Sequence, residues 1–181
     1  MLFTRRISPL QIDAVEVPGA TGLIGLLHCP GLNYTHGDIE WNRSLDEDLD
    51  ALQAWGASAL LTLIESHEFK MLGVPDLGEH VGARMRWYWI PIPDGGAPDQ
   101  AADAAWVGVR RELVEALRTG RSVALHCHAG LGRSGTMAAS LLTCFGVSAS
   151  EAIATVRRSR PGAIQTDEQE KYVSRASRKS C

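Results

Sequence analysis

The residue types best suited to chemistry stand together in one segment, His-Cys-His-Ala-Gly-Leu-Gly-Arg-Ser at 126–134. Its glycines, Gly130 and Gly132, allow the backbone to curl so that successive N–H groups point inward, and such a nest binds anions. An apolar run at 122–126 predicts a strand before the segment, and the run MAASLLTCF predicts a helix after it. The nest should therefore lie at a helix N-terminus, where the dipole and free N–H donors favour a phosphate or sulfate dianion.

Three side chains of this segment can act on a bound phosphate. Arg133 can close the nest with a bidentate fork onto two phosphate oxygens. Cys127 begins the nest, and the field that favours phosphate also favours thiolate over thiol, which prepares a nucleophile for in-line attack on phosphorus. Ser134 can donate a hydrogen bond to the sulfur and stabilise it as a leaving group in a second step. A buried cysteine near a glycine-rich turn is the simpler explanation of any one of these residues, but their joint pattern favours catalysis.

Phosphoryl transfer also needs a proton for the leaving oxygen, and Asp94 is the candidate general acid. It stands in the turn-rich loop PDGGAPD at 93–99, after a predicted strand at 84–92. Asp99 competes for this role, but it precedes a long helical pattern and is better explained as an N-cap. Taken alone, Asp94 would be an ordinary turn aspartate.

The pattern His-Cys-x5-Arg-Ser resembles the signature of the protein tyrosine and dual-specificity phosphatases. PIPDGGAPD at 91–99, LHCHAGLGRSG at 125–135 and GAIQTDEQEKYV at 162–173 are most similar to the kinase-associated phosphatase family, of the cyclin-dependent kinase inhibitor 3 type. The similarity is clear over residues 84–173. Weaker similarity, in VPDLGEH at 74–80 and in a predicted helix at 45–55, extends it to most of the chain.

This resemblance implies a hydrolase that dephosphorylates phosphotyrosine, phosphoserine or phosphothreonine through a phosphocysteine intermediate. It implies Cys127 as nucleophile, Arg133 as clamp and Asp94 as general acid on a movable loop. It also places Gln165 where a glutamine positions the hydrolytic water, although the residue alone would be a surface polar group. No metal or cofactor is expected, because the nest and the arginine supply the positive charge. The backbone donors to the phosphate would be those of His128, Ala129, Gly130, Leu131, Gly132 and Arg133.

Departures from particular branches of the family bear on the substrate. The tyrosine-specific branch has a WPD loop and an Asn-Arg-Tyr segment that deepens its pocket, whereas this chain has IPIPDGG at 90–96 and no Asn-Arg-Tyr. We therefore expect a shallow pocket that accepts all three phosphorylated side chains. Lysines typical of the lipid-directed branch are missing from the loop, which disfavours phosphoinositides. The expected partner is a phosphorylated protein, with a kinase as one candidate, and the oligomeric state stays open.

Some residues near the motifs have structural explanations. His126 is expected to hold the loop backbone through a ring nitrogen. His128 can either touch substrate or face solvent. Glu65, His67 and Glu68 have poor spacing for a metal, so surface or rim polarity is the better interpretation.

The other cysteines show no metal-ligand spacing. Cys29 and Cys144 are expected to be small buried hydrophobes. An accessible thiolate is prone to oxidation, and Cys144 is a secondary candidate for a partner to oxidised Cys127.

The elements around the motifs alternate as in an α/β domain with a mainly parallel central sheet flanked by helices. Apolar runs at 22–28 and 57–64 predict two further buried strands. Capping signals predict helices over 45–55, from Asp99 towards Gly120, from Ser148 to just before 161, and from Thr166 onward. A single domain is expected over 1–181, with its core at about 20–175 and a frayed tail at 175–181.

Composition supports this class. The chain has 181 residues, 45% of them apolar, and its net charge of −3 gives no reason to expect nucleic acid or a membrane surface as partner. No apolar run approaches the roughly 18 residues of a membrane span, and the N-terminal residues lack the pattern of a secretory signal. A cytoplasmic location is the expectation.

Three alternatives remain. A phosphatase for a lipid, sugar, nucleotide or RNA 5′ phosphate would have the same cradle. A non-catalytic phosphate-binding module would be expected to lack Cys127, Arg133 or Asp94, yet all are present. A sulfurtransferase or arsenate reductase also uses a loop cysteine, but predicts neither the upstream PDGG aspartate nor the downstream IQT glutamine.

Overall fold

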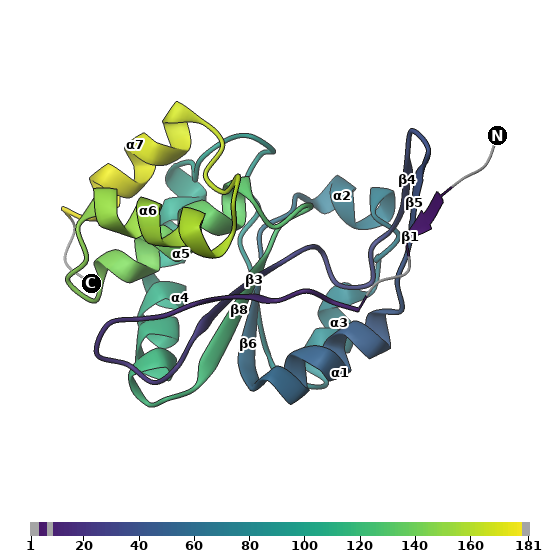
Figure 1. The fold of residues 1–181 in the computed structure, drawn as a ribbon, viewed down its shortest axis with the longest axis horizontal. Helices are drawn as coiled ribbons and strands as arrows, with labels where there is room; N and C mark the ends of the chain where they lie inside the picture. The colour runs from purple at the N-terminus through teal and green to yellow at the C-terminus, as the bar shows by residue number, and fades with distance from the viewer. Residues whose placement is uncertain (1–3, 7–8, 179–181) are drawn as a thin grey trace.

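The computed structural model describes residues 4–6 and 9–178. A five-stranded sheet forms its centre, in the order β2-β3-β8-β6-β7 (Figure 1). The strands are β2 (Asp13–Val15), β3 (Ile24–Leu27), β8 (Ser122–His126), β6 (Ala57–Thr62) and β7 (Arg86–Trp89). All neighbouring pairs are parallel except β2 with β3. The mainly parallel sheet predicted from the apolar runs is confirmed.

Helices cover both faces of this sheet, as parallel sheets require (Figure 1). One layer contains α1 (Leu45–Trp55) and α3 (Leu77–Gly82), and the other contains α4 (Gln100–Arg118), α5 (Gly132–Thr143), α6 (Ala149–Ser159) and α7 (Asp167–Ala176). The short α2 (Ser66–Met71) follows β6. Helix α5 contacts β3, β8, α6 and α7, and eleven of its twelve residues are buried. The segment at 126–134 leads into this buried helix, which therefore fixes its position.

A small second sheet has the order β1-β5-β4, with β1 (Thr4–Arg6), β5 (Ile39–Asn42) and β4 (Asn33–His36). Strands β4 and β5 form a hairpin in which His36 pairs with Ile39, so its two-residue loop is Gly37-Asp38. Gly37 takes a positive φ of 58°, as two-residue hairpin turns require. The sequence-based prediction missed this hairpin.

Helix boundaries follow the predicted caps. The Asp99 side chain accepts a hydrogen bond from the Ala102 N–H at 2.8 Å, which confirms its capping role. Ser44 and Ser148 cap α1 and α6 in the same way, and Thr166 forms a capping box with α7. Strand β7 is shorter than the predicted 84–92, because the chain leaves the sheet before the prolines of the acid loop.

The packed region is wider than the predicted 20–175. Val15 and Val17 are buried on the N-terminal side, and α7 continues to a buried Ala176. Two residues assigned to a frayed tail are therefore helical, because α7 still has a surface to pack on; residues 179–181 lie outside the described part. Among the described residues, no helix has the length and apolarity to cross a bilayer.

Candidate active site

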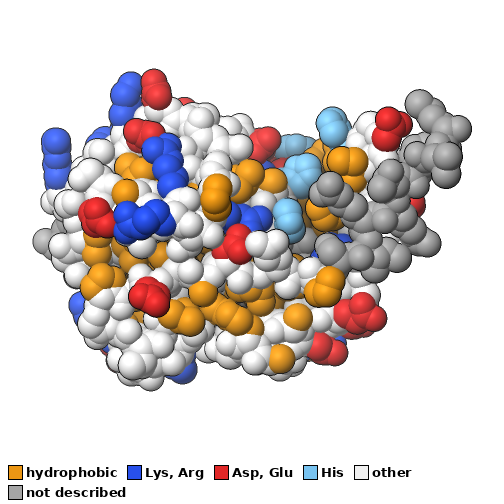
Figure 2. All heavy atoms as spheres, viewed as in Figure 1, with side chains coloured by type: hydrophobic (Ala, Val, Ile, Leu, Met, Phe, Trp, Pro, Cys, Tyr) orange, Lys and Arg blue, Asp and Glu red, His pale blue; other side chains and the backbone are white. Residues whose placement is uncertain are grey.

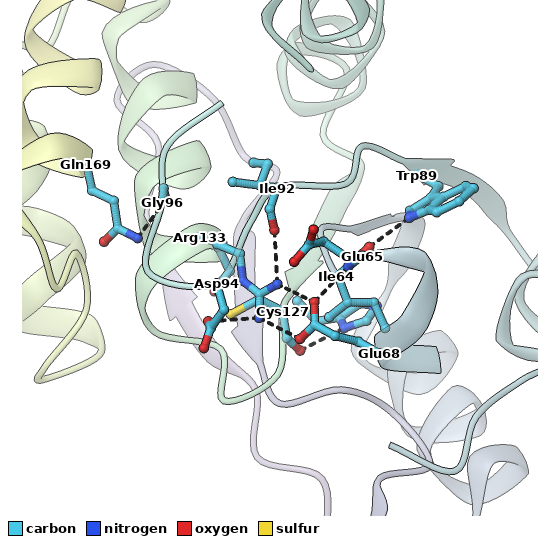
Figure 3. Close-up of polar contacts among 12 residues, drawn as sticks. Ile64, Glu65, Glu68, Trp89, Ile92, Asp94, Gly96, Cys127, Arg133 and Gln169 are labelled. Atoms are coloured by element: carbon cyan, nitrogen blue, oxygen red, sulfur yellow. Dashed lines mark hydrogen bonds and ion pairs between the residues drawn. The ribbon is translucent and has the colours of Figure 1, made fainter. Parts of the chain in front are cut away.

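The site lies at the carboxyl end of β8, where the chain turns through residues 127–131 into the N-terminus of α5. Because β8 lies between two parallel neighbours, this edge of the sheet is the usual place for a ligand in an open α/β sheet. The turn brings the Cys127 sulfur beside the Arg133 guanidinium, and the loop after β7 brings Asp94 to the same place (Figure 3). Cys127 and Arg133 are only 3% and 1% exposed.

The scaffold around the turn holds its carbonyl groups and so orients its N–H groups. Four carbonyl oxygens of the loop are held by hydrogen bonds. The Cys127 oxygen lies 3.1 Å from Nδ1 of the preceding His126, and the His128 oxygen accepts from the Cys29 N–H at 3.0 Å. The Ala129 oxygen accepts from Arg160 Nη2 at 2.8 Å, and the Leu131 oxygen accepts from the Ile164 N–H at 3.2 Å. In a trans peptide the N–H of the next residue points the opposite way. The N–H groups of residues 128, 129, 130 and 132 therefore face away from these partners, towards the inside of the turn.

Gly130 makes this curl possible. Its φ is +71°, and a Cβ on it would lie 2.2 Å from the Leu27 carbonyl oxygen. Only glycine fits both the left-handed backbone and the close approach to β3. The loop is therefore pressed against the neighbouring strand rather than projecting from the surface.

The Arg133 guanidinium is fixed by a bidentate ion pair with Glu68 from α2. Arg133 Nη1 lies 2.6 Å from Glu68 Oε2 and Nη2 lies 3.0 Å from Oε1, while Nη1 also donates to the Ile92 carbonyl at 3.1 Å. Burial works against both charges, but the hydrogen bonds between them prevail: the pKa of Glu68 falls below its ordinary value and the pKa of Arg133 rises. Arg133 Nε is buried without a hydrogen-bond partner among the described residues, so it offers a further donor to an anion in the nest.

Asp94 occupies the other side of the same guanidinium. Its Oδ1 lies 3.0 Å from Arg133 Nη2, and its side chain is 77% exposed. Figure 3 shows the guanidinium between the carboxylates of Asp94 and Glu68. The two acids differ in kind, because Glu68 is enclosed by the fold whereas Asp94 stands on an exposed loop that solvent can reach.

A chain of hydrogen bonds behind the turn defines the state of His126. Trp87 Nε1 donates to Thr62 Oγ1 at 2.9 Å, and that hydroxyl lies 2.8 Å from His126 Nε2. The hydroxyl proton then points to Nε2, which leaves the ring proton on Nδ1 to be donated to the Cys127 carbonyl; this tautomer is assigned from the network. Burial lowers the pKa of His126 to about 4, so the ring is neutral. Ser134 Oγ lies 3.6 Å from the Cys127 sulfur.

The segment before α7 lies against the turn and carries Gln165. A methyl group on Gly132 would lie 2.7 Å from Gln165 Oε1, so this side chain covers the end of the phosphate loop. Ile164, just before it, has a φ of 58°, the one positive value of a non-glycine residue in the described chain. Backbone strain of this kind gathers at functional sites.

Buried Gln169 ties this segment to the acid loop. Its Oε1 accepts from the Gln165 N–H at 2.8 Å, and its Nε2 donates to the Gly96 carbonyl at 3.0 Å. Thr166 Oγ1 adds a bond to the Gly95 carbonyl at 3.1 Å. These hydrogen bonds fix the loop that carries Asp94 relative to the turn that carries Gln165.

His128 leaves the loop to line a neighbouring cleft of about 240 Å³. Its ring meets Tyr34 edge-on at 5.3 Å, and the His28 ring lies 5.2 Å from Trp41. Burial lowers the pKa of His28 to about 4 and the pKa of His128 below its ordinary value, so both imidazoles are neutral at physiological pH. Histidines gather on this face of the molecule beside hydrophobic side chains (Figure 2).

The site corrects two expectations. Glu68 is not surface or rim polarity, since it is 3% exposed and paired with Arg133. Cys144 follows the far end of α5, about 18 Å from its start at 1.5 Å per residue, which is too far for a disulfide with Cys127. Cys29 is fully buried as expected, and burial, with a smaller contribution from the nearby Cys127, raises the pKa of its thiol. No cluster of metal-ligating side chains occurs within the described residues.

Sequence reasoning missed Glu68, Arg160, Gln169 and Thr62. Glu68 follows the carboxyl end of a predicted buried strand, the sheet edge where ligands gather, and that position was its one available signal. The other three act through contacts between segments far apart in the chain, which no local pattern reports.

Comparison with known proteins agrees with this geometry. Residues 37–147 match the family model described as "Polymorphic toxin system, DSP-PTPase phosphatase". Cyclin-dependent kinase inhibitor 3 of the rat (Rattus norvegicus) is 31% identical over 174 residues, covering 92% of this chain and 78% of the relative, and the pig (Sus scrofa) protein is 33% identical over the same shares. A crystal structure of kinase-associated phosphatase, with its catalytic-site cysteine replaced by serine, superposes with a TM-score of 0.80 at 28% identity, covering 93% of this chain and 94% of that one.

The chain therefore belongs to the dual-specificity protein phosphatases. It is a cysteine-dependent protein phosphatase, as the signature at 126–134 predicted.

The acid stability of the protein should depend on Glu68. Its pKa is lowered by folding, so its stabilising contribution is complete above the ordinary value of 4.5 and is lost as the pH falls through the lower folded-state pKa. We expect Glu68→Gln to flatten that acid limb in urea unfolding curves recorded from neutral pH to about pH 3. At neutral pH, Glu68→Ala should lower the free energy of unfolding by about 3–5 kcal/mol, because it leaves a buried guanidinium without its Glu68 partner.

Glu151→Gln, which removes an exposed partner of Arg158, is the matched control and should change the unfolding curves little. Equal acid limbs in the parent and in Glu68→Gln would contradict the assignment.

The phosphate nest should collapse in Gly130→Ala. The new methyl group would overlap the Leu27 carbonyl oxygen and force the loop outward. The affinity for vanadate and kcat/KM for p-nitrophenyl phosphate should therefore both fall at least about hundredfold. Gly146→Ala supplies the control, since Gly146 has a similar φ of +80° but open space around its Cα. It should lose stability by about 1–2 kcal/mol and keep its activity. Equal activities of the two variants would show that the curl of the loop is not needed.

Proposed function

We propose that the chain hydrolyses phosphoserine, phosphothreonine and phosphotyrosine on protein substrates through a phosphocysteine formed on Cys127. The observation that carries this proposal is the buried Arg133 guanidinium, fixed by Glu68 beside the Cys127 sulfur and the inward N–H groups. A site with such donors on one side and a nucleophilic sulfur on the other fits a tetrahedral oxyanion such as phosphate.

In the first step the Cys127 thiolate attacks phosphorus in line with the ester oxygen. The S–P bond forms as the P–O ester bond breaks, and the leaving oxygen takes a proton from the Asp94 carboxyl group. Charge on the transferred group is spread over its equatorial oxygens, where Arg133 and the loop N–H groups stabilise it.

For this step Asp94 must leave Arg133 and take up a proton from solvent, because a carboxylate paired with the guanidinium has no proton to donate. At rest it holds Arg133 Nη2, which a phosphate oxygen would need. A bound phosphate would take that position, and the displaced carboxyl group, still on the loop held at Gly95 and Gly96, would lie near the leaving oxygen. Its 77% exposure supports such a movement, because no packed side chain has to be moved with it.

In the second step a water molecule attacks phosphorus and the S–P bond breaks. Asp94, now a carboxylate, accepts the proton of the water, and Ser134 donates a hydrogen bond to the departing sulfur. Gln165 is the candidate to orient the water, since its side chain lies over Gly132 at the end of the loop. Phosphate then leaves and the thiolate is restored.

The range of substrates rests on the expected shallow pocket and on the loop, which recognises phosphate rather than the group that carries it. The names of the relatives link those proteins to kinases. A phosphorylated kinase is accordingly one candidate substrate for this chain.

The thiolate mechanism is tested with p-nitrophenyl phosphate in excess EDTA. We expect turnover that resists the chelator in the parent protein and disappears in Cys127→Ser, which should still bind vanadate. Turnover that depends on a divalent metal, or that survives the substitution, would rule the mechanism out. A parent that binds vanadate but turns nothing over would instead be a binding module.

The role of Asp94 is tested by the leaving group. An alkoxide needs the proton more than a nitrophenolate does, so Asp94→Asn should lower kcat/KM about 10²–10⁴-fold for a phosphothreonine peptide and much less for p-nitrophenyl phosphate. Asp99→Asn serves as control, because that residue caps α4 and should affect both substrates equally and weakly. The same loss on both substrates in Asp94→Asn would assign the residue to phosphate binding alone.

A further inference from the structure

A groove of about 1050 Å³ lies between α4 and the β7 edge of the central sheet. Its sheet side is formed by Ser58 and Ala59 of β6 and by Arg86 and Tyr88 of β7. Ala59 pairs with Arg86 at the amino ends of these strands, whereas the phosphate loop follows the carboxyl end of β8. Most of the groove therefore lies towards the opposite ends of the strands from the catalytic site, and its lining includes no residue of the phosphate loop.

The groove is basic on a chain that is acidic overall. Its exposed charged residues are four arginines and two glutamates, namely Arg86, Arg111, Arg118, Arg121, Glu112 and Glu115. They sum to a net +2 (4 − 2), whereas the whole chain carries −3. A further arginine, Arg110, is buried and is not counted.

One of the two glutamates is already engaged. Glu112 accepts from Tyr88 at 2.6 Å and from Arg86 at 3.3 Å on the sheet side. Arg118 lies over the Phe145 ring at 5.6 Å, a contact that leaves its donors to other groups. With Arg86 and Glu112 paired to each other, the remaining exposed charges of the groove are Arg111, Arg118 and Arg121 against Glu115, so its net positive charge comes from α4 and from Arg121 just beyond its end.

Gly108 adds an independent observation. It stands inside the 19-residue helix α4, where glycine is less favourable than alanine, and a Cβ on it would meet nothing within 4 Å. The packing of the chain therefore does not require glycine at this position. Its neighbour Val107 is 56% exposed and also lines the groove. Gly108 leaves a place on α4 that another backbone can approach closely, and Val107 offers an apolar contact beside it.

We propose that this groove docks an extended, acidic segment of the phosphoprotein substrate, remote from its phosphorylated residue. Alternate side chains of an extended segment point to opposite sides, so one set can pack on Ala59 and Val107 while carboxylates reach Arg111 and Arg118. The inference rests on the proposed function for the identity of the partner. Docking would hold the substrate near the site and so lower KM without changing the chemical step.

The binding test uses a fluorescein-labelled peptide of alternating glutamate and valine, measured by fluorescence polarisation. We expect saturable binding that weakens with salt, and a rise in Kd of at least about tenfold in the double variant Arg111→Glu/Arg118→Glu. Gly108→Trp should block binding by filling that place on α4, whereas Gly108→Ala should keep it. No saturable binding, equal effects of the two Gly108 variants, or tighter binding of a lysine–valine peptide or a single-stranded RNA would each overturn the proposal.

The kinetic test compares a phosphothreonine peptide with the same peptide joined through a flexible linker to the acidic segment. We expect a lower KM for the extended substrate, lost in Arg111→Glu/Arg118→Glu and in Gly108→Trp, with kcat/KM for p-nitrophenyl phosphate unchanged in all variants. Normal turnover with equal KM values for the two peptides overturns the docking site alone. A parent protein that shows no Cys127-dependent turnover of p-nitrophenyl phosphate would instead overturn the proposed function.

Discussion

The site depends on the buried ion pair between Arg133 and Glu68. Burying a guanidinium that is 1% exposed costs much free energy unless its charge is paired, and the enclosed Glu68 carboxylate supplies the partner through two hydrogen bonds. Glu68 is itself oriented by the Glu65 N–H, which donates to Oε2 at 2.7 Å. The short α2 thus fixes the fork of an arginine that stands sixty-five residues later in the chain. Because the hydrogen bonds of Arg133 to Glu68 stay in place, the guanidinium face that meets Asp94 can exchange one anion for another. Asp94 occupies it at rest, and a phosphate oxygen can replace Asp94 without leaving the arginine unpaired.

The curl of the phosphate loop depends on restraints from three separate segments. Cys29 after β3, Arg160 after α6 and Ile164 before α7 each bind a loop carbonyl from outside. Arg160 also pairs with Asp13 of β2, so the edge of the sheet is linked to the loop through one buried side chain. These contacts explain why Ile164 can hold a positive φ, which would otherwise relax. The N–H groups are therefore oriented before any anion arrives, and binding does not have to order them.

The sequence predicted the parts of this site that are local and left out the parts that are distant. Cys127, Arg133 and Ser134 lie within one turn and the following helix, so their meeting follows from the chain itself. Asp94 and Gln165 needed the family resemblance, because a turn aspartate and a polar residue after a proline-containing turn have many ordinary explanations. The parallel sheet could be predicted since buried strands are continuous apolar runs. The β4–β5 hairpin could not, because its strands are exposed or half-buried and show no clear alternation.

A cradle built from peptide N–H groups and one arginine recognises a phosphate and very little of what carries it. The adjoining cleft adds neutral imidazoles and aromatic rings, which can favour a flat or apolar neighbour but supply no charge to select a partner. Choice among phosphoproteins must then come from surface beyond the site. On a chain of net charge −3, the basic groove beside Gly108 offers such a surface. Because it lies mostly towards the opposite ends of the strands from the phosphate loop, a substrate that fills both must be a folded or extended protein rather than a small phosphate ester.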